Sequence, residues 1–180
     1  CGAGSFILSD KSDCVECPAG QWQDQNNQFN CTPCDIGKYS TLTMQTSNAN
    51  CKDDCNAGSY IPLDKSDCLS CNKGEYQDQN DQSSCKNCVA GKYNDQSESK
   101  PIACKPCPSG TYRAAGKNAD CLSCNKGNYQ DENDQSSCKN CELGKYNDQT
   151  ESKPIACKAC PSGTYSYFGA ESCAITCPNG

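Results

Sequence analysis

The chain has 180 residues, of which 21 are cysteine and none is histidine, and its formal net charge is −6. Leu, Ile, Val and Phe together number only 17, too few for an ordinary hydrophobic core, so the cysteines indicate a disulfide scaffold. The composition excludes a Ser-His-Asp or Cys-His catalytic arrangement within the chain, disfavours nucleic-acid binding, and leaves no apolar run long enough for a membrane span.

The cysteine content also indicates the compartment. So many cysteines persist as disulfides only in an oxidising environment, so we expect an extracellular or cell-surface protein. The repeated pattern described below is cut at both ends of the sequence. We therefore interpret the chain as a segment of a longer array.

Internal repeats dominate the sequence. Residues 72–112 and 125–165 are identical at 35 of 41 positions, and CGAGSFILSDKSDC at the N-terminus aligns with CNAGSYIPLDKSDC at Cys55. The aligned copies divide the chain into super-repeat 1 (1–54), super-repeat 2 (55–106), super-repeat 3 (107–159) and a truncated fourth (160–180).

A shorter module recurs about three times in each super-repeat. It reads Cys-x-x-Gly-x-aromatic, then a polar loop, then a closing Cys, and it occurs ten times. Modules 1 to 10 begin, in chain order, at Cys1, Cys17, Cys34, Cys55, Cys71, Cys88, Cys107, Cys124, Cys141 and Cys160. Glycine permits a turn with positive φ, and the aromatic residue suits a short strand, so each module predicts a small hairpin. We expect one packing aromatic residue per module: Phe6, Trp22, Tyr39, Tyr60, Tyr76, Tyr93, Tyr112, Tyr129, Tyr146 and Tyr165.

Sequence alone does not settle how the cysteines pair. The favoured scheme joins the first Cys of each module to the next Cys along and leaves Cys177 for a residue outside the segment. A rival scheme interlocks alternate cysteines, first with third and second with fourth. The favoured pairs are Cys1–Cys14, Cys17–Cys31, Cys34–Cys51, Cys55–Cys68, Cys71–Cys85, Cys88–Cys104, Cys107–Cys121, Cys124–Cys138, Cys141–Cys157 and Cys160–Cys173.

These features predict a small disulfide-rich fold, mostly irregular, with short β-hairpins and no large hydrophobic core. Because each module must bury its surface against its neighbours, we expect an elongated tandem array, rod-like or solenoid-like.

The repeated motif resembles a known family. The segments CPAGQW at Cys17 and CPSGTY at Cys107 and Cys160 are similar to growth-factor-receptor-type cysteine-rich repeats, and above all to ephrin-receptor-like modules. Tumour-necrosis-factor-receptor and EGF-like repeats are more distant. The resemblance implies extracellular stalks or ligand-contacting segments without enzymatic activity.

Two sets of residues resemble metal sites. The spacing of Cys14, Cys17, Cys31 and Cys34 approaches that of a zinc ribbon, but the cysteines run on as an unbroken series. The clusters of Asp78, Asn80 and Asp81 and of Asp131, Asn133 and Asp134 are rich in oxygen ligands, but they lack the spacing of an EF-hand loop. We therefore expect no metal, no cofactor and no catalytic residues.

The sequence also contains a candidate modification site and candidate partner surfaces. The only N-x-[ST] sequon is Asn30-Cys31-Thr32, in which the central Cys makes Asn30 a poor glycosylation acceptor, while O-linked glycans on Ser and Thr are compatible with a secreted protein. The best candidates for a partner surface are Trp22 and Phe29, followed by Tyr167 and Phe168.

Two functions fit the sequence. The first is a non-enzymatic structural protein, a disulfide-stapled shaft that forms or coats a surface filament such as a cell-surface or flagellar hair. Repetition favours it, because a lattice uses one contact many times and open head-to-tail contacts propagate. The second is the stalk of a receptor or adhesin that binds a protein or glycan. The expected partners are accordingly further copies, other extracellular proteins or glycans.

Overall fold

The computed structural model describes residues 1–10, 13–95, 101–116, 120–150 and 153–174. The chain forms two compact units: unit 1 comprises Cys1–Lys86 and Gln96–Ala103, and unit 2 comprises Asn87–Asp95 and Cys104–Gly180. The described residues contain short strands and a single turn of 3₁₀ helix, without an α-helix. The small disulfide-rich fold with short hairpins predicted from the sequence is confirmed. The expected rod-like arrangement stays a prediction.

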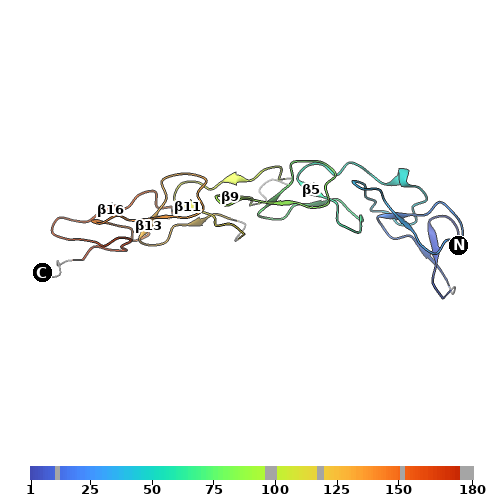
Figure 1. Ribbon diagram of the computed structural model, residues 1–180, viewed down its shortest axis with the longest axis horizontal. Coiled ribbons are helices and arrows are strands. Elements are labelled where there is room, and N and C mark those ends of the chain that lie inside the picture. Colours follow the sequence, from blue (N-terminus) through green and yellow to red (C-terminus); the bar gives the residue numbers. More distant parts are fainter. Residues whose placement is uncertain (11–12, 96–100, 117–119, 151–152, 175–180) are drawn as a thin grey trace. The chain divides into compact units, whose positions relative to one another are not determined.

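Short two-stranded ladders form the regular structure of most modules (Figure 1). In unit 1 they pair β1 (Ser5–Ile7) with β2 (Cys14–Glu16), β3 (Gln21–Trp22) with β4 (Thr32–Pro33), and β5 (Ser59–Tyr60) with β6 (Leu69–Ser70). A ladder also joins β7 (Glu75–Tyr76) to β8 (Lys86–Asn87). In unit 2 they pair β9 (Lys92–Tyr93) with β10 (Lys105–Pro106), β11 (Thr111–Tyr112) with β12 (Leu122–Ser123), β13 (Asn128–Tyr129) with β14 (Lys139–Asn140), and β15 (Lys145–Tyr146) with β16 (Lys158–Ala159).

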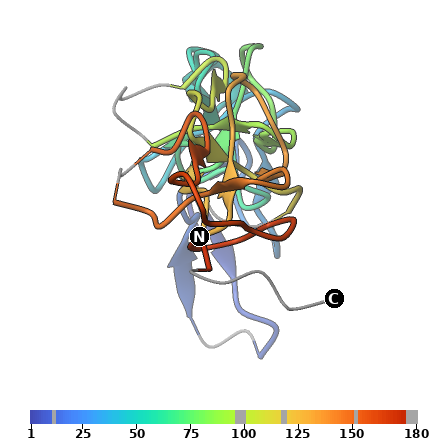
Figure 2. The ribbon, with the colours of Figure 1, turned by 90° about the vertical axis from the view of Figure 1, so that its left-hand side faces the viewer.

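The strands are antiparallel and follow the same register from module to module. The aromatic residue of the motif lies opposite the residue after the closing Cys, as in Tyr60 opposite Leu69 and Tyr129 opposite Lys139. The longest of these hairpins, β1–β2, is drawn in blue in Figure 2. A two- or three-residue ladder is weak by itself, so the hairpins depend on the disulfides and on neighbouring modules.

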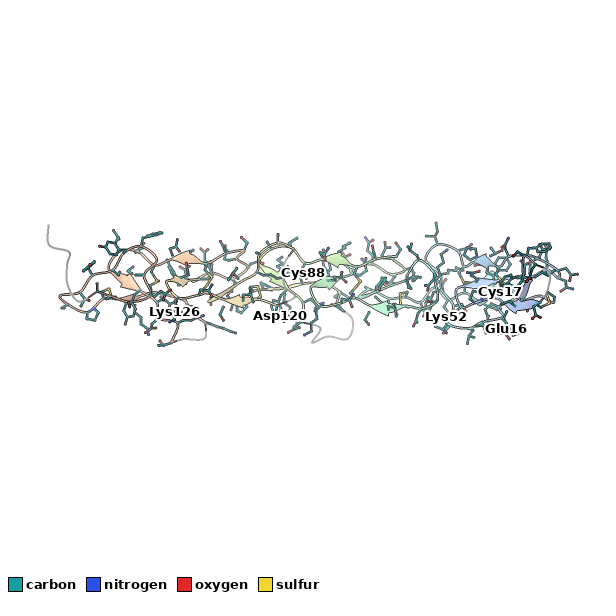
Figure 3. The ribbon with its side chains drawn as sticks, turned by 90° about the horizontal axis from the view of Figure 1, so that it is seen from below. Glu16, Cys17, Lys52, Cys88, Asp120 and Lys126 are labelled. Carbon is teal, nitrogen blue, oxygen red and sulfur yellow. A yellow bond between two sulfur atoms is a disulfide. The ribbon has the colours of Figure 1, made fainter. Side chains whose placement is uncertain are left out.

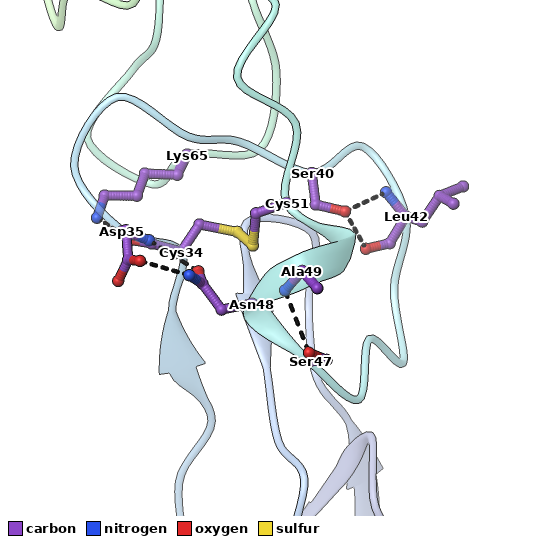
Figure 4. Close-up of a disulfide and its surroundings, with 9 residues drawn as sticks. All are labelled: Cys34, Asp35, Ser40, Leu42, Ser47, Asn48, Ala49, Cys51 and Lys65. Carbon is purple, nitrogen blue, oxygen red and sulfur yellow. Dashed lines mark hydrogen bonds between the residues drawn. A yellow bond between two sulfur atoms is a disulfide. The ribbon is translucent and has the colours of Figure 1, made fainter.

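Two modules replace the ladder with a single bridge. Tyr39 pairs with Lys52 in module 3, and Tyr165 pairs with Ala174 in module 10. Module 3 also contains the 3₁₀ helix η1 (Asn48–Asn50), whose first residues are capped by the Ser47 hydroxyl accepting from the Ala49 N–H (Figure 4).

Ten disulfides join the first Cys of each module to the next Cys along the chain, from Cys1–Cys14 to Cys160–Cys173, with sequence separations of 13 to 17. Their Cα–Cα distances of 5.4 to 5.9 Å lie in the usual range. Each disulfide thus closes one module. Cys177 lies outside the described residues.

Cysteines and polar side chains, rather than aromatic rings, make up the buried interior. The first Cys is buried in the modules within the array, as at Cys17 and Cys88 (Figure 3). Of the ten motif aromatics, only Tyr39 is buried, with 8% exposed, and the others are half-buried. The residue directly after the aromatic is buried in nine modules: Gln23, Ser40, Ile61, Gln77, Asn94, Arg113, Gln130, Asn147 and Ser166.

The disulfide pairing can be tested directly in solution. Proteolysis of the non-reduced chain followed by mass spectrometry should recover peptides linked within modules, such as one containing Cys107 and Cys121. A linked pair of Cys107 and Cys124 would instead support the interlocked scheme and contradict the structure.

Candidate functional site

The site that recurs along this chain is the junction between one module and the next. The N–H of the motif glycine donates to the carbonyl of the buried residue that follows the aromatic of the next module, at 2.6 to 3.3 Å. The pairs joined in this way are Gly4–Gln23, Gly20–Ser40, Gly58–Gln77, Gly91–Arg113, Gly110–Gln130, Gly127–Asn147 and Gly144–Ser166.

The carbonyl of the same glycine makes the second bond of the junction. It accepts from the N–H of the first Cys of the next module, as at Gly4 from Cys17 (2.9 Å) and at Gly127 from Cys141 (2.8 Å). Seven glycines therefore hold the next module by both of their backbone polar groups. A net contribution of about 1 kcal/mol per backbone hydrogen bond makes this junction a stabilising contact that is repeated along the chain.

Two properties of glycine are required at this position. Its φ is positive, +82° at Gly4 and +80° at Gly110, a region that side chains disfavour. A Cβ at Gly4 would also lie 2.6 Å from the Met44 carbonyl oxygen, and one at Gly110 would lie 2.5 Å from the Lys153 carbonyl carbon. Met44 and Lys153 belong to the module after next, so within each unit a module contacts the two modules that follow it.

The residue after the aromatic forms a second connection. Its N–H donates to the loop of the next module, as from Arg113 to the Gln135 carbonyl at 3.1 Å and from Gln130 to the Pro154 carbonyl at 3.0 Å. Where this residue is Gln, its side-chain amide also donates to a carbonyl of its own loop, from Gln23 to Asn30 at 2.7 Å. Sequence reasoning missed these residues, although their signal was the recurrence of Gln, Asn or Ser directly after seven of the ten motif aromatics.

The oxygen-rich loop residues also bind backbone of the preceding module. Asn80 Oδ1 accepts from the Ala57 N–H at 2.9 Å, and Asp81 Oδ1 accepts from the Cys55 N–H at 3.1 Å. In the repeat, Asn133 Oδ1 accepts from the Ser109 N–H at 2.7 Å. These loop residues, candidate calcium ligands in the sequence, thus cap backbone N–H groups.

One loop residue in several modules takes a left-handed conformation and donates its N–H to the first Cys carbonyl of the preceding module. Asp81 (φ +58°) donates to Cys55 at 2.7 Å, and Asp134 (φ +64°) donates to Cys107 at 2.8 Å. Asp and Asn tolerate this conformation better than most residues, which accounts for their recurrence in these loops. Asp134 also approaches Lys92, with 3.9 Å between carboxylate and ammonium.

Ion pairs between an aspartate and a lysine span several of the hairpins. Asp78 binds Lys86 at 2.5 Å and Asp131 binds Lys139 at 2.6 Å, and these contacts lower the pKa of both carboxylates. Because all four side chains are exposed, each pair contributes little to stability.

Asp148 is held more firmly. Its pKa is lowered to about 2, first because the Thr150 N–H donates to the carboxylate, and also because Lys158 and the Thr150 hydroxyl donate to it.

Arg113 is the sole arginine of the chain and is 5% exposed. Its guanidinium Nη1 donates to the carbonyls of Cys88 at 3.0 Å and Val89 at 3.2 Å in the preceding module. Lys65 Nζ bonds to the Cys34 carbonyl in the same manner (Figure 4), and Gln149 Nε2 bonds to that of Cys124 at 3.1 Å. Long side chains therefore satisfy first-Cys carbonyls that would otherwise be buried without a donor.

Tyr39 is the centre of a small apolar cluster with Cys55, Ile61 and Cys68. Its hydroxyl donates to Asp54 Oδ1 at 2.8 Å. Burial, followed by the contact with Asp54, raises the pKa of Tyr39 to about 12. The Tyr39 ring therefore packs against module 4, while its neutral hydroxyl donates within module 3.

The residues predicted as partner surfaces differ in exposure. Phe29, Tyr167 and Phe168 are exposed, and the Tyr167 ring packs edge-on against Tyr165 with 5.4 Å between centroids. Trp22 is half-buried, and its indole N–H is the one buried side-chain donor without a partner among the described residues. Asn30, the sequon residue, is exposed.

Neither a metal cluster nor a membrane helix occurs in the part of the chain that the structure describes. No group of three or more His, Cys, Asp or Glu side chains is placed there to hold a metal ion. None of the described helical segments has the length and hydrophobicity that crossing a bilayer requires.

Comparison with known proteins identifies related repeats. The family model described as tyrosine-protein kinase ephrin type A/B receptor-like matches residues 4–55, 58–103 and 114–156. The "Sushi, von Willebrand factor type A, EGF and pentraxin domain-containing protein 1" of Rattus norvegicus is 30% identical over 77 residues, or 43% of this chain, and that of Mus musculus matches equally. Thyroglobulin of Rattus norvegicus is 40% identical over 55 residues, or 31% of this chain. The matches span 2% of the length of each relative.

The two CPSGTY segments offer a matched test of the junction. Gly110 and Gly163 have φ of +80° and +82°, but only at Gly110 would a Cβ meet another described residue within 4 Å. Gly163→Ala should lower the free energy of unfolding by about 1 kcal/mol, because alanine is strained at positive φ. Gly110→Ala should lower it by about 2–4 kcal/mol, because overpacking adds to that strain. Chemical unfolding with the disulfides intact measures both; equal losses would contradict the contact between module 7 and module 9.

Arg113→Ala should destabilise unit 2 by about 2–3 kcal/mol, because it removes charged hydrogen bonds from two carbonyls. Ser166→Ala is the matched control, since Ser166 occupies the same position in module 10 and its hydroxyl donates to the Lys145 carbonyl at 2.7 Å. In the same denaturation experiment, Ser166→Ala should lower the free energy of unfolding by about 1 kcal/mol. An Arg113→Ala loss no greater than that of the control would show that the guanidinium contacts contribute nothing extra.

Protonation of Asp148 at low pH should destabilise the loop of module 9. Because its pKa in the folded chain lies below the ordinary value of 3.8, the stabilisation is fully present above pH 3.8 and is lost as the pH falls toward about 2. NMR titration of the side-chain carboxyl carbon should give a midpoint near pH 2, with Asp148→Asn removing that signal. A midpoint at the ordinary value would contradict the three hydrogen bonds.

Proposed function

Because this chain belongs to the family of ephrin-receptor-like cysteine-rich repeats, we propose that it is a non-enzymatic, extracellular structural protein. Its function is to form a disulfide-stapled shaft that builds or coats a surface filament, such as a cell-surface or flagellar hair. The super-repeats 1–54, 55–106, 107–159 and 160–180 are the units of that shaft.

One observation carries this proposal: the same backbone junction recurs from module to module. Seven glycines each donate to and accept from the next module with the same groups. A binding protein needs its contact surface once, whereas a shaft needs an identical contact at every step. The near-identity of residues 72–112 and 125–165 supports the same conclusion.

The extracellular location follows from the covalent structure. Ten disulfides persist only where the environment is oxidising. The similarity to cysteine-rich repeats in the large relatives named above supports the same location.

A receptor or adhesin stalk is the second candidate. The observation that favours it is the aromatic pair Tyr167 and Phe168, which are 62% and 64% exposed and have no equivalent in the CPSGTY module at Cys107. Exposed aromatic residues are enriched where proteins bind partners. In this alternative a single patch binds a protein or glycan, and the repeats hold it away from the surface.

Electron microscopy of the native, non-reduced material distinguishes the two. The structural function predicts uniform filaments with an axial repeat that the 52- to 54-residue period of the sequence accounts for. The variant Tyr167→Ser, Phe168→Ser should leave those filaments intact. Discrete single particles ending in a partner or a membrane anchor, with partner binding lost in this variant, would overturn the proposal.

A further inference from the structure

The two cysteines of each disulfide differ in their exposure to solvent. In modules 2 to 9 the first Cys is buried, with no more than 4% of its surface exposed. The closing Cys is partly exposed in each of these modules except module 3, at Cys31, Cys68, Cys85, Cys104, Cys121, Cys138 and Cys157. A reagent in solvent therefore reaches these disulfides from the side of the closing Cys.

The first Cys is also held by both neighbouring modules. The Cys17 N–H donates to the Gly4 carbonyl of module 1, and the Cys17 carbonyl accepts from the Met44 N–H of module 3, both at 2.9 Å. Cys107 is held in the same way, by the Gly91 carbonyl at 2.7 Å and by the Asp134 N–H at 2.8 Å. The cysteine that solvent does not reach is thus the one whose backbone is fixed.

Module 3 departs from this pattern. Both of its cysteines are buried, Cys34 with 1% exposed and Cys51 with 5%. The helix η1 ends directly before Cys51, whose N–H donates to the Asn48 carbonyl at 3.0 Å. The Asn48 side chain accepts from the Asp35 N–H at 3.2 Å and donates to the Asp35 carboxylate (Figure 4). It therefore ties η1 to the residue after Cys34, across the disulfide.

Modules 6 and 9 are matched comparisons for module 3, because all three contain the Gly-Lys-Tyr motif. Before the closing Cys they have Pro-Ile-Ala, where module 3 has Asn-Ala-Asn. Proline has no side-chain amide for the bonds that Asn48 makes, and the closing residues Cys104 and Cys157 are partly exposed. The burial of Cys51 thus accompanies η1 and its tie to Asp35.

We propose that the closing cysteines of modules 2 and 4 to 9 are sites of thiol–disulfide exchange with small extracellular thiols, and that η1 protects Cys34–Cys51 from this exchange. A thiol then loosens the other modules one at a time, while module 3 stays closed. The exchange is a property of the single chain, so it holds whether the shaft builds a filament or a receptor stalk.

The exchange begins when a thiolate attacks the sulfur of the closing Cys. A bond forms between the two sulfurs, the original disulfide bond breaks, and the first Cys leaves as a thiolate. Because the neighbouring modules hold the first Cys beside the mixed disulfide, its return attack expels the reagent and restores the bond.

Full reduction of a module requires a second thiol. Its thiolate attacks the reagent sulfur of the mixed disulfide, and the closing Cys leaves as a thiolate. The two reagent molecules depart joined by their own disulfide, so their oxidation supplies the two electrons that the protein disulfide gains. Their two thiol protons end on the two cysteines.

Timed exposure of the disulfide-bonded chain to reduced glutathione, followed by acid quenching, alkylation and peptide mass spectrometry, tests the proposal. Cys34–Cys51 should open roughly 10-fold or more slowly than Cys17–Cys31 and Cys55–Cys68. These two disulfides are matched controls, because they flank module 3 within unit 1 and would open together with it if the whole unit unfolded. Glutathione should be attached to Cys31 and Cys68. Equal opening rates of the three disulfides, whether fast or slow, or glutathione on Cys17 or Cys55 instead, would overturn the proposal.

A variant of η1 tests the cause of the protection. Asn48→Ala removes both side-chain hydrogen bonds to Asp35, so the opening rate of Cys34–Cys51 should rise about 10-fold, toward that of its neighbours. Asn50→Ala is the matched control, because Asn50 is exposed at the end of the same helix, and it should leave the rate unchanged. Equal rates in the two variants would contradict the protective role of η1.

Discussion

The structure depends on a glycine whose two backbone polar groups both bond to the next module. Its positive φ turns the chain after each first Cys, and its missing side chain lets the module after next approach. At Gly110 the N–H donates to Gln130, the carbonyl accepts from Cys124, and Lys153 lies against the α-carbon. A single position therefore sets the turn, the connection to the next module and the contact beyond it.

This constraint explains how the chain folds with so few large apolar residues. Each disulfide removes conformational freedom from a loop of 13 to 17 residues in the unfolded chain, worth about 3 kcal/mol on the loop-entropy model. The buried side chains between modules are cysteines and hydrogen-bonded polar groups such as Gln130 and Arg113. Buried polar groups are tolerated here because their hydrogen bonds are made, and these bonds also fix the register between modules.

The repeated motif made the fold predictable from the sequence, but it did not show which residues of each module are buried. The spacing of Cys, Gly and aromatic residues predicted ten hairpin modules, and the family resemblance is confirmed by the matching family model. Sequence reasoning assigned the interior to the aromatic residues, yet rings such as Tyr112 and Tyr129 are only half-buried. The buried residue is the next one, because adjacent strand positions point to opposite faces. Its side chain bonds to its own loop, as at Gln130, or to the preceding module, as at Arg113.

Sequence reasoning missed the contacts that loop residues make with other modules for a related reason. Asn80 and Asp81 suggest a cation site when their loop is considered alone, but their oxygens accept N–H groups 23 and 26 residues away. A pattern within one module does not reveal such contacts, since their partners lie in another.

Amide hydrogen exchange followed by NMR tests the central claim most directly, namely that the glycine junctions hold the modules together. The account predicts that the N–H groups of Gly110 and Cys124 exchange slowly and at similar rates, as do those of Gly127 and Cys141, because each pair shares one junction. Exchange of these amides at the rate of an unstructured chain, with the disulfides intact, would contradict it.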